Sequence, residues 1–278
     1  MATPVLSTHV IDGALGPITI DVRAQSRTQP RPALLILHGF KGFKDWGMFP
    51  TFAERVARSG VTAITCNVSG SGVAGEQFAH PDRFARNTCT RELGDITAVI
   101  DALMAGGLGV APPPRLGLLG HSRGGGLAIL VAARDERVSA LVTWAAISTV
   151  ARWDAEIIAE WRRRGTLPDL NSRTGEVLHR HVEVLEDALT NAAGSLDIRA
   201  AAARMRCPWL LVHGTADEAV PLAEAEALLA VAPPATTTPL PVPGAGHTFG
   251  AVHPWRGSTP ELDQTMESTI RWCLRAVG

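Results

Sequence analysis

Tyrosine is absent from all 278 residues, so no phenol group takes part in the chemistry of this protein. No apolar run approaches the 18 residues that a membrane-spanning helix needs, and we therefore expect no membrane span. The 26 basic and 27 acidic residues nearly cancel and form no basic block, which makes nucleic acid an unexpected partner. The 46% of apolar residues are typical of a globular protein with a substantial core.

Cysteine is scarce and scattered, with no C-x-x-C pair that would indicate a zinc or redox site. The first twelve residues lack a basic segment followed by an apolar stretch, so no secretory signal is expected. Both observations favour reduced thiols and a cytoplasmic protein. The cysteines are Cys66, Cys89, Cys207 and Cys273.

One short motif carries most of the information: residues 120–124 read GHSRG, with a glycine two positions to each side of Ser122. An apolar run at residues 116–119 precedes it, and a helix-like stretch at residues 125–133 follows it. This context predicts a nucleophile elbow, a tight strand-to-helix turn that exposes a serine hydroxyl and aims the first helical amides at its target. A purely structural glycine turn is the alternative, but the flanking strand and helix favour a catalytic serine.

A catalytic serine needs a histidine to accept its proton and a carboxylate to orient that histidine. An apolar run at residues 208–212 predicts a strand followed by Asp217, and residues 236–242 predict a strand followed by His247. The carboxyl ends of parallel strands meet at one edge of a sheet, where ligand sites of such sheets lie. We therefore predict Ser122, Asp217 and His247 as a catalytic triad.

The carboxylate has another explanation. Asp217 is well placed to cap a helix that begins near Pro221. Glu218 is the nearest competing carboxylate, but it lies further from the end of the strand, so Asp217 is preferred.

The other histidines are less well placed than His247. His38 and His213 end strands, where a hydrogen bond to a nearby loop is the favoured role, and His121 is expected to point away from the serine hydroxyl. His179 and His181 are two residues apart, so on a helix they do not share a face. Because no cysteine or carboxylate ligand set accompanies them, we predict no metal site and no cofactor.

The first of the central apolar runs, residues 34–37, leads into a loop that is expected to supply part of an oxyanion hole. We predict that the backbone amides of Phe40 and of Arg123, the residue after the serine, donate to the developing oxyanion. Lys41 and Lys44 in the same loop are candidates for the mouth of a site for anionic acyl groups, although solvated surface lysines are the favoured interpretation.

Taken together, these residues resemble an α/β-hydrolase of the serine esterase and peptidase type, in the group of dienelactone-hydrolase-like and prolyl-oligopeptidase-like domains. The resemblance covers most of the chain and implies about eight strands in a mostly parallel sheet, with helices on both faces. Dienelactone hydrolases use a cysteine where this chain has Ser122. Because of this difference, the resemblance does not indicate which substrate the protein acts on. The segments that carry the resemblance are residues 38–40, 120–125, 213–217 and 246–247.

The order of elements independently predicts an α/β fold. A hairpin at residues 10–22 comes first, and strands then alternate with helices, which is typical of a parallel sheet. Residues 70–75 match G-x-G-x-x-G, but Pro81 follows soon after, so we expect a tight turn rather than a dinucleotide site. The later strands are expected at residues 33–38, 61–67, 115–120, 138–146, 207–213 and 236–242, and the helices at 48–59, 87–105, 122–134, 222–231 and 261–276.

One segment, residues 149–204, contains no apolar strand and is rich in charge. We predict that it is a lid inserted into a single domain spanning residues 1–278, with a solvated helical decoration as the alternative. Either Trp144 or Trp153, near its start, is a candidate wall for an acyl group, although aromatic residues of this kind more often belong to the core. Within it, helices are expected at residues 152–164 and 182–189, and a loop or small hairpin at 167–178.

The sequence thus predicts a serine hydrolase that cleaves a small or medium carboxylic ester through an acyl-enzyme intermediate. A peptidase, an amidase or an acyltransferase with the same triad is the first alternative. A non-catalytic ligand-binding protein of the same fold is the second, although binding alone does not require a triad. The sequence does not predict an oligomeric state.

Overall fold

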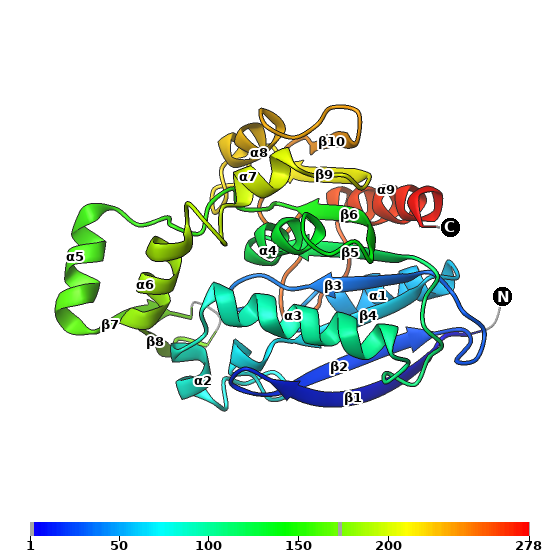
Figure 1. The fold of residues 1–278 in the computed structure, drawn as a ribbon, viewed down its shortest axis with the longest axis horizontal. Coiled ribbons are helices and arrows are strands. Elements are labelled where there is room, and N and C mark those ends of the chain that lie inside the picture. The colour runs from blue at the N-terminus through cyan, green and yellow to red at the C-terminus, as the bar shows by residue number, and fades with distance from the viewer. Residues whose placement is uncertain (1–2, 172–173, 278) are drawn as a thin grey trace.

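The computed structural model describes residues 3–171 and 174–277, which are built around an eight-stranded sheet in the order β1-β2-β4-β3-β5-β6-β9-β10 (Figure 1). β2 is antiparallel to β1 and β4, and from β4 to β10 all neighbours are parallel. The predicted, mostly parallel sheet is therefore confirmed. Its strands are β1 (Val5–Gly13), β2 (Gly16–Ala24), β3 (Ala33–Leu37), β4 (Thr62–Asn67), β5 (Leu116–His121), β6 (Val138–Trp144), β9 (Trp209–Gly214) and β10 (Thr237–Val242).

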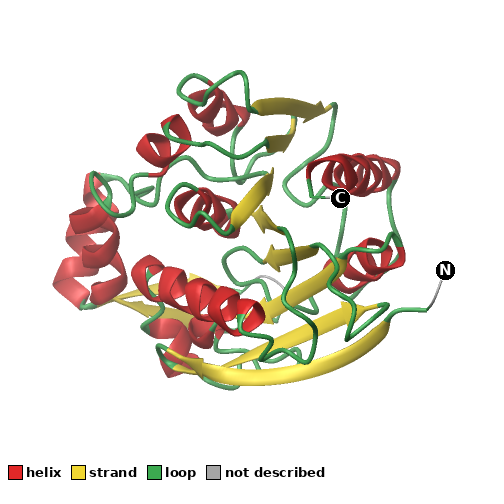
Figure 2. Ribbon diagram, turned by 45° about the vertical axis from the view of Figure 1, so that its right-hand side comes forward, coloured by secondary structure: helices red, strands yellow, loops and turns green. Residues whose placement is uncertain are grey.

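Helices cover both faces of this sheet. Successive side chains of each strand point to opposite faces, and the apolar residues on both faces need to be buried. In β3, Leu34 and Ile36 pack into one apolar cluster with α1 (Phe49–Arg58) and α9 (Pro260–Ala276). Leu35 and Leu37 belong to the other cluster, on the opposite face. Helices lie on both sides of the sheet in Figure 2. That face is covered by α3 (Cys89–Met104), α4 (Arg123–Ala132), α7 (Ile198–Ala203) and α8 (Leu222–Leu229).

Two short helices were not expected from the sequence, α2 (Pro81–Ala85) and α7. Each spans only five or six residues, too few to show an apolar period. The glycine-rich segment before α2 forms a single turn of 3-10 helix, Ser69–Ser71, and Gly70 packs tightly against the Asn87 side chain. That turn does not run into a long helix, as the dinucleotide motif requires.

The segment between β6 and β9 projects from one end of the sheet (left in Figure 1). Trp161, Val184 and Leu185 give it a small core of its own, while Leu178 packs against Phe78 and Phe84 of the main body. The region expected to be a loop or small hairpin is an antiparallel hairpin. The projecting elements are α5 (Ala155–Arg164), β7 (Thr166–Leu170), β8 (Val177–His181) and α6 (Val182–Asn191).

Trp144 belongs to the core and not to the wall of a substrate site. Its side chain is fully buried, its ring lies 4.7 Å from that of Phe52, and its Nε1 donates a hydrogen bond of 3.0 Å to Thr269 Oγ1. Because Thr269 lies on α9, this bond ties the helix to the end of β6. The alternative of a Trp144 acyl wall is therefore wrong.

We expect Thr269→Val to lower the free energy of unfolding by about 1–3 kcal/mol, because the buried indole N–H of Trp144 then lacks an acceptor. Thr269→Ser keeps the acceptor and is the matched control, losing only a methyl group. Urea denaturation of both variants measures the difference. Equal stability of Thr269→Val and the wild type would contradict this account of the α9 contact.

Candidate active site

Ser122 occupies the turn between β5 and α4 with φ 57° and ψ −121°. This backbone conformation costs roughly 1–3 kcal/mol, so the surroundings must hold it. The Ser122 amide donates to the Trp144 carbonyl at 2.9 Å, and the Ser122 carbonyl accepts from the Gly125 amide at 3.0 Å. A side chain at Gly124 would collide with the backbone carbonyl of His38, which accounts for the glycine. The predicted strand-to-helix turn lies where the motif placed it.

The structure brings the three predicted triad residues into one hydrogen-bonded chain. Nδ1 of His247 lies 2.8 Å from Oδ2 of Asp217, and Nε2 of His247 lies 3.0 Å from Oγ of Ser122. A carboxylate only accepts, so Nδ1 carries the proton and Nε2 is left to accept from the hydroxyl. This is the tautomer in which the histidine is able to act as a base toward the serine.

Asp217 uses its two oxygens for different tasks. Oδ1 accepts from the amides of Ala219 (2.9 Å) and Val220 (2.8 Å), while Oδ2 accepts from His247. The side chain is fully buried; burial opposes ionisation, but the hydrogen bonds from His247 and Val220 outweigh it and hold the pKa of Asp217 below its ordinary value. Asp217 therefore holds its own loop and His247 together, and the exposed Glu218 takes no part in the chain.

His121 lies beside His247, an arrangement that the sequence did not indicate. The two ring centroids are 4.7 Å apart, and Nε2 of His121 donates to the backbone carbonyl of His247 at 2.9 Å. Burial, reinforced by the neighbouring His247 ring, lowers the pKa of His121 to about 3. His121 thus holds the His247 backbone while remaining uncharged.

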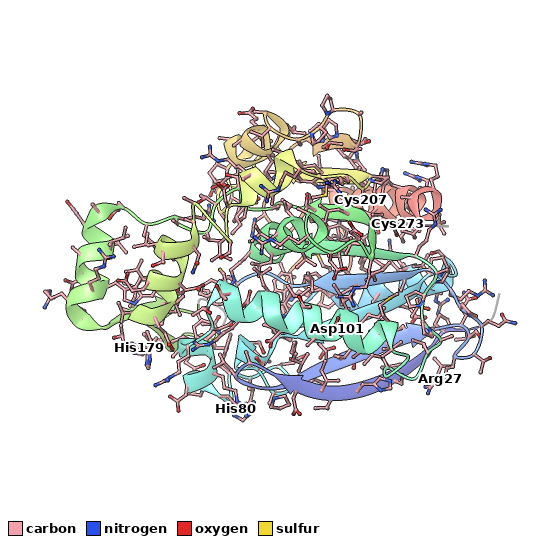
Figure 3. All side chains as sticks on the ribbon, viewed as in Figure 1. Arg27, His80, Asp101, His179, Cys207 and Cys273 are labelled. Carbon is pink, nitrogen blue, oxygen red and sulfur yellow. The ribbon has the colours of Figure 1, made fainter. Side chains whose placement is uncertain are left out.

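Two other histidines lie at or just after the carboxyl ends of strands. His38 donates to the carbonyl of Gly39 (2.9 Å) and His213 to that of Val220 (2.8 Å), as predicted for strand-end histidines. Burial lowers the pKa of His38 to about 4. Figure 3 shows His179 on the projecting hairpin. Within residues 3–171 and 174–277, no three His, Cys, Asp or Glu side chains converge as a metal site.

The two amides predicted for an oxyanion hole lie in segments that meet at Ser122. A Cβ atom on Gly39 would stand 2.8 Å from Cβ of Ser122, so the loop carrying Phe40 passes directly against Ser122. Among the described residues, neither the Phe40 amide nor the Arg123 amide donates a hydrogen bond to another group. Both are therefore available to a bound oxygen.

Side chains also connect these two segments. The Arg123 guanidinium lies over the Phe40 ring, 4.7 Å from its centroid, and forms an ion pair with Glu92. Glu92 is buried, and burial raises the pKa of its carboxyl group despite the Arg123 charge. The Glu92–Arg123–Phe40 contact therefore joins α3, the elbow and the oxyanion loop.

Two cavities meet at Ser122 and Phe40. One, of about 260 Å³, is also lined by His247, Thr248 and His253. The other, of about 330 Å³, lies toward the projecting segment. Its other lining residues are Cys89, Arg123, Ile147, Val150, Arg152, Trp153, Arg180, Val184, Ala188 and Ala219.

The lysines of the loop are not the solvated side chains that the sequence favoured. Lys41 lines the smaller cavity and pairs with Asp169 of the projecting hairpin at 2.6 Å. Lys44 is 11% exposed and pairs with Asp21 and Asp45, away from both cavities. Only Lys41 thus lies near the site, and its ion pair with Asp169 joins residues too distant in sequence to be predicted as partners.

Arg180, on β8, was not predicted from the sequence as a residue of the site. In an extended strand, residues two apart share a face, so Arg180 lies on the same face as the buried Leu178. This alternation of side chains was the one signal in the sequence that could have indicated an inward-facing Arg180. Trp153, one of two candidate walls, does line the larger cavity.

Comparison with known proteins extends the likeness to nearly the whole chain. The sequence pattern that defines the prolyl oligopeptidase family matches residues 48–252. The chain is 26% identical over 224 residues to a 2,6-dihydropseudooxynicotine hydrolase of Paenarthrobacter nicotinovorans, covering 81% of this chain. The chain spans about half the length (54%) of that relative.

Among solved structures, ferulic acid-bound Est1E from Butyrivibrio proteoclasticus superposes with a TM-score of 0.76 at 19% identity, covering 97% of this chain and 99% of Est1E. A puromycin-hydrolyzing peptidase of Mycobacterium tuberculosis gives a TM-score of 0.69 at 20% identity, covering 99% of this chain and 40% of the peptidase. At such identities the likeness concerns the fold. The helices within residues 3–171 and 174–277 include none with the length and hydropathy of a membrane span.

The buried neutral histidines predict a pH dependence of stability. His38 and His121 take up protons readily once unfolded, with a pKa near 6.5, but resist protonation when folded. The free energy of unfolding is therefore unaffected by these histidines above about pH 6.5. It falls as the pH drops toward about 4, by roughly 1.4 kcal/mol per pH unit for each histidine. His121→Gln, which keeps a hydrogen-bond donor, is expected to reduce this slope.

Denaturant titrations at pH 7, 6 and 5 measure the slope for the wild type and for His121→Gln. The exposed His179→Gln variant serves as the control and is expected to follow the wild type. An identical pH slope in His121→Gln and the wild type would show that His121 is not held neutral by burial.

Proposed function

Because the chain belongs to the prolyl oligopeptidase family of hydrolases and has the α/β-hydrolase fold, we propose that it cleaves small or medium carboxylic esters through Ser122. One observation carries the proposal: the hydrogen-bonded chain of Asp217, His247 and Ser122 ends at the point where two cavities meet. A site of this kind supplies a nucleophile with its base, and separate spaces for the two halves of a substrate.

In the first step, Oγ of Ser122 attacks the ester carbonyl carbon while Nε2 of His247 takes the hydroxyl proton. The carbonyl π electrons move to the oxygen, and the amides of Phe40 and Arg123 donate to this oxyanion. When the carbonyl re-forms, the bond to the alkoxy group breaks, and His247 returns the proton to the departing alcohol. An acyl-enzyme on Ser122 remains.

In the second step, water attacks the acyl carbon and gives its proton to His247. The bond to Ser122 Oγ breaks, Ser122 regains the proton, and a carboxylic acid leaves. The buried Asp217 carboxylate stabilises the imidazolium that forms in both steps. His121, uncharged at neutral pH, adds no positive charge against it.

The proton transfer to the leaving group indicates which cavity holds the alcohol and which holds the acyl group. Since His247 must reach the leaving oxygen, the alcohol occupies the smaller cavity, which His247 lines. The acyl group then occupies the larger cavity on the other side of Ser122, toward the projecting segment, residues 149–204. This supports a lid role for that segment, whose Trp153 and Arg180 face the acyl group.

The prolyl oligopeptidase match favours a second candidate, cleavage of an amide or peptide bond. The same chain of residues serves, with His247 protonating a departing amine instead of an alcohol. Esters and amides that share one acyl group separate the two candidates, because only the leaving group differs.

We expect the wild type to hydrolyse p-nitrophenyl esters from acetate upward faster than the matching p-nitroanilides. Ser122→Ala should reduce kcat by roughly 10⁵- to 10⁶-fold, and Asp217→Asn by about 10⁴-fold through loss of the correct His247 tautomer. Ser195→Ala, at an exposed serine, is the matched control and should retain full activity. Spectrophotometric release of p-nitrophenol and p-nitroaniline measures all four proteins.

A fluorophosphonate probe gives an independent reading, since it reacts with an activated serine regardless of acyl specificity. Labelling of the wild type at Ser122, and none in Ser122→Ala, is expected. Ester hydrolysis that survives in Ser122→Ala would exclude Ser122 as the nucleophile, and faster anilide cleavage would favour the amidase candidate.

A further inference from the structure

We propose that the substrate's acyl group carries a carboxylate at the end remote from the scissile bond, and that Arg180 binds it. This inference rests on the proposed function, because it uses the assignment of the larger cavity to the acyl group. It names the chemical class of the substrate as a monoester of a short dicarboxylic acid.

The larger cavity combines an apolar lining with an unusual charge pattern. The described residues around it include three arginines, Arg123, Arg152 and Arg180, and no carboxylate. Guanidinium groups bind planar anions, above all carboxylates, through paired hydrogen bonds. The question is therefore which of the three has charge left for a ligand.

Two of these arginines each have an acidic partner of their own. Arg123 pairs with the buried Glu92. Arg152 lies 3.4 Å from Glu224 and donates to the carbonyl of Ala219 at 3.1 Å. Neither provides uncompensated charge to the cavity.

Arg180 is different, because it shares its one acidic partner. Asp169 lies 2.9 Å from Arg180 and 2.6 Å from Lys41, so two cations meet a single carboxylate. The group carries one net positive charge. The Arg180 side chain is only 12% exposed, and an unbalanced charge in so shielded a place calls for an anion.

Aromatic rings fix the position of Arg180. The centre of its guanidinium lies 4.7 Å from the Trp161 centroid, 5.1 Å from that of Phe40 and 5.7 Å from that of Trp153. Among the described residues, its side-chain nitrogens make no hydrogen bond beyond the Asp169 ion pair. The cation is held in place at the cavity, and its buried Nε has no hydrogen-bond partner in the part of the chain that the structure describes.

The apolar residues of the same cavity suit the chain that links the two ends of such an acyl group. Ile147, Val150 and Ala188 line the space between the elbow and the projecting segment. A volume of about 330 Å³ accommodates a short methylene chain and a carboxylate. The competing interpretation is that Arg180 only stacks on its rings and that a neutral aromatic acyl group fills the cavity.

A matched pair of esters tests the charge directly. Monoethyl adipate ends in a carboxylate, and ethyl adipamate ends in a neutral amide of nearly the same shape. We expect the wild type to prefer monoethyl adipate by about 10- to 100-fold in kcat/KM, the range of a charged hydrogen-bonded contact. Ethanol release measures both rates, and ethyl benzoate represents the neutral aromatic class.

The variants then assign the preference to Arg180. Arg180→Gln should abolish the preference, and Arg180→Lys should restore part of it through its charge. The readout in each variant is the ratio of kcat/KM for monoethyl adipate to that for ethyl adipamate, because a change that slows both esters alike cancels in this ratio. Arg163→Gln, at an exposed arginine of α5 paired with Glu160, is the matched control and should keep the full preference.

The outcomes separate this inference from the proposed function. Hydrolysis of ethyl adipamate or ethyl benzoate at least as fast as that of monoethyl adipate would overturn the carboxylate site and leave the esterase proposal intact. A preference that persists in Arg180→Gln would show that another residue binds the substrate carboxylate, and would also overturn the inference.

Binding of the product settles the case in which no ester is turned over. Calorimetric titration of the wild type with adipate and glutarate should show binding that weakens at least tenfold in Arg180→Gln and with rising salt. Loss of ester hydrolysis together with such binding would contradict the proposed function alone. Absence of binding of either dicarboxylate to the wild type would overturn the inference.

Discussion

Ser122 joins β5 to α4 through a strained backbone turn, and this turn determines how closely the surrounding elements must pack. A residue with φ 57° at the junction of β5 and α4 keeps this strained conformation only if the surrounding structure excludes the alternative ones. Glycines at positions 120, 124, 125 and 126 let the sheet, the helix and the loop after β6 approach closer than side chains permit. That approach brings the oxyanion loop against Ser122. The order of β5, β9 and β10 in the sheet then fixes where Asp217 and His247 arrive.

The parts of this arrangement that depend on local sequence were predictable. The elbow follows from glycine spacing between a strand and a helix, and the edge where Asp217 and His247 lie follows from parallel strands. The main-sheet elements end within a few residues of their predicted positions, apart from the long opening hairpin, because apolar runs and turn residues mark them. The short helices α2 and α7 lack such a period and were missed.

Other features depend on contacts between segments far apart in sequence. Nothing in the neighbourhood of Lys41 or Lys44 reveals Asp169 or Asp21 as partners, so both lysines were expected in solvent. Arg180 lies in a charged stretch whose inward-facing side becomes visible only when the hairpin packs on Phe78 and Phe84. His121 was expected to point away from the serine hydroxyl, and its contact with the His247 backbone depends on how the loop after β10 packs against the end of β5. Of the cavity-lining side chains in the inserted segment, Trp153 was a candidate from the sequence, whereas Arg180 was not.

Phe40 has a consequence for how such a protein changes over evolutionary time. Its amide belongs to the oxyanion loop, its ring lines both cavities, and Arg180 and Lys41 connect that ring to the inserted hairpin. In the proposed mechanism, a substitution in the hairpin that reshapes the acyl cavity therefore also shifts the loop whose amide donates to the oxyanion. Descendants that acquire a new preference through this hairpin are expected to lose turnover first, and to regain it by compensating changes around Phe40. Substrate range and catalytic power are, in this architecture, inherited together.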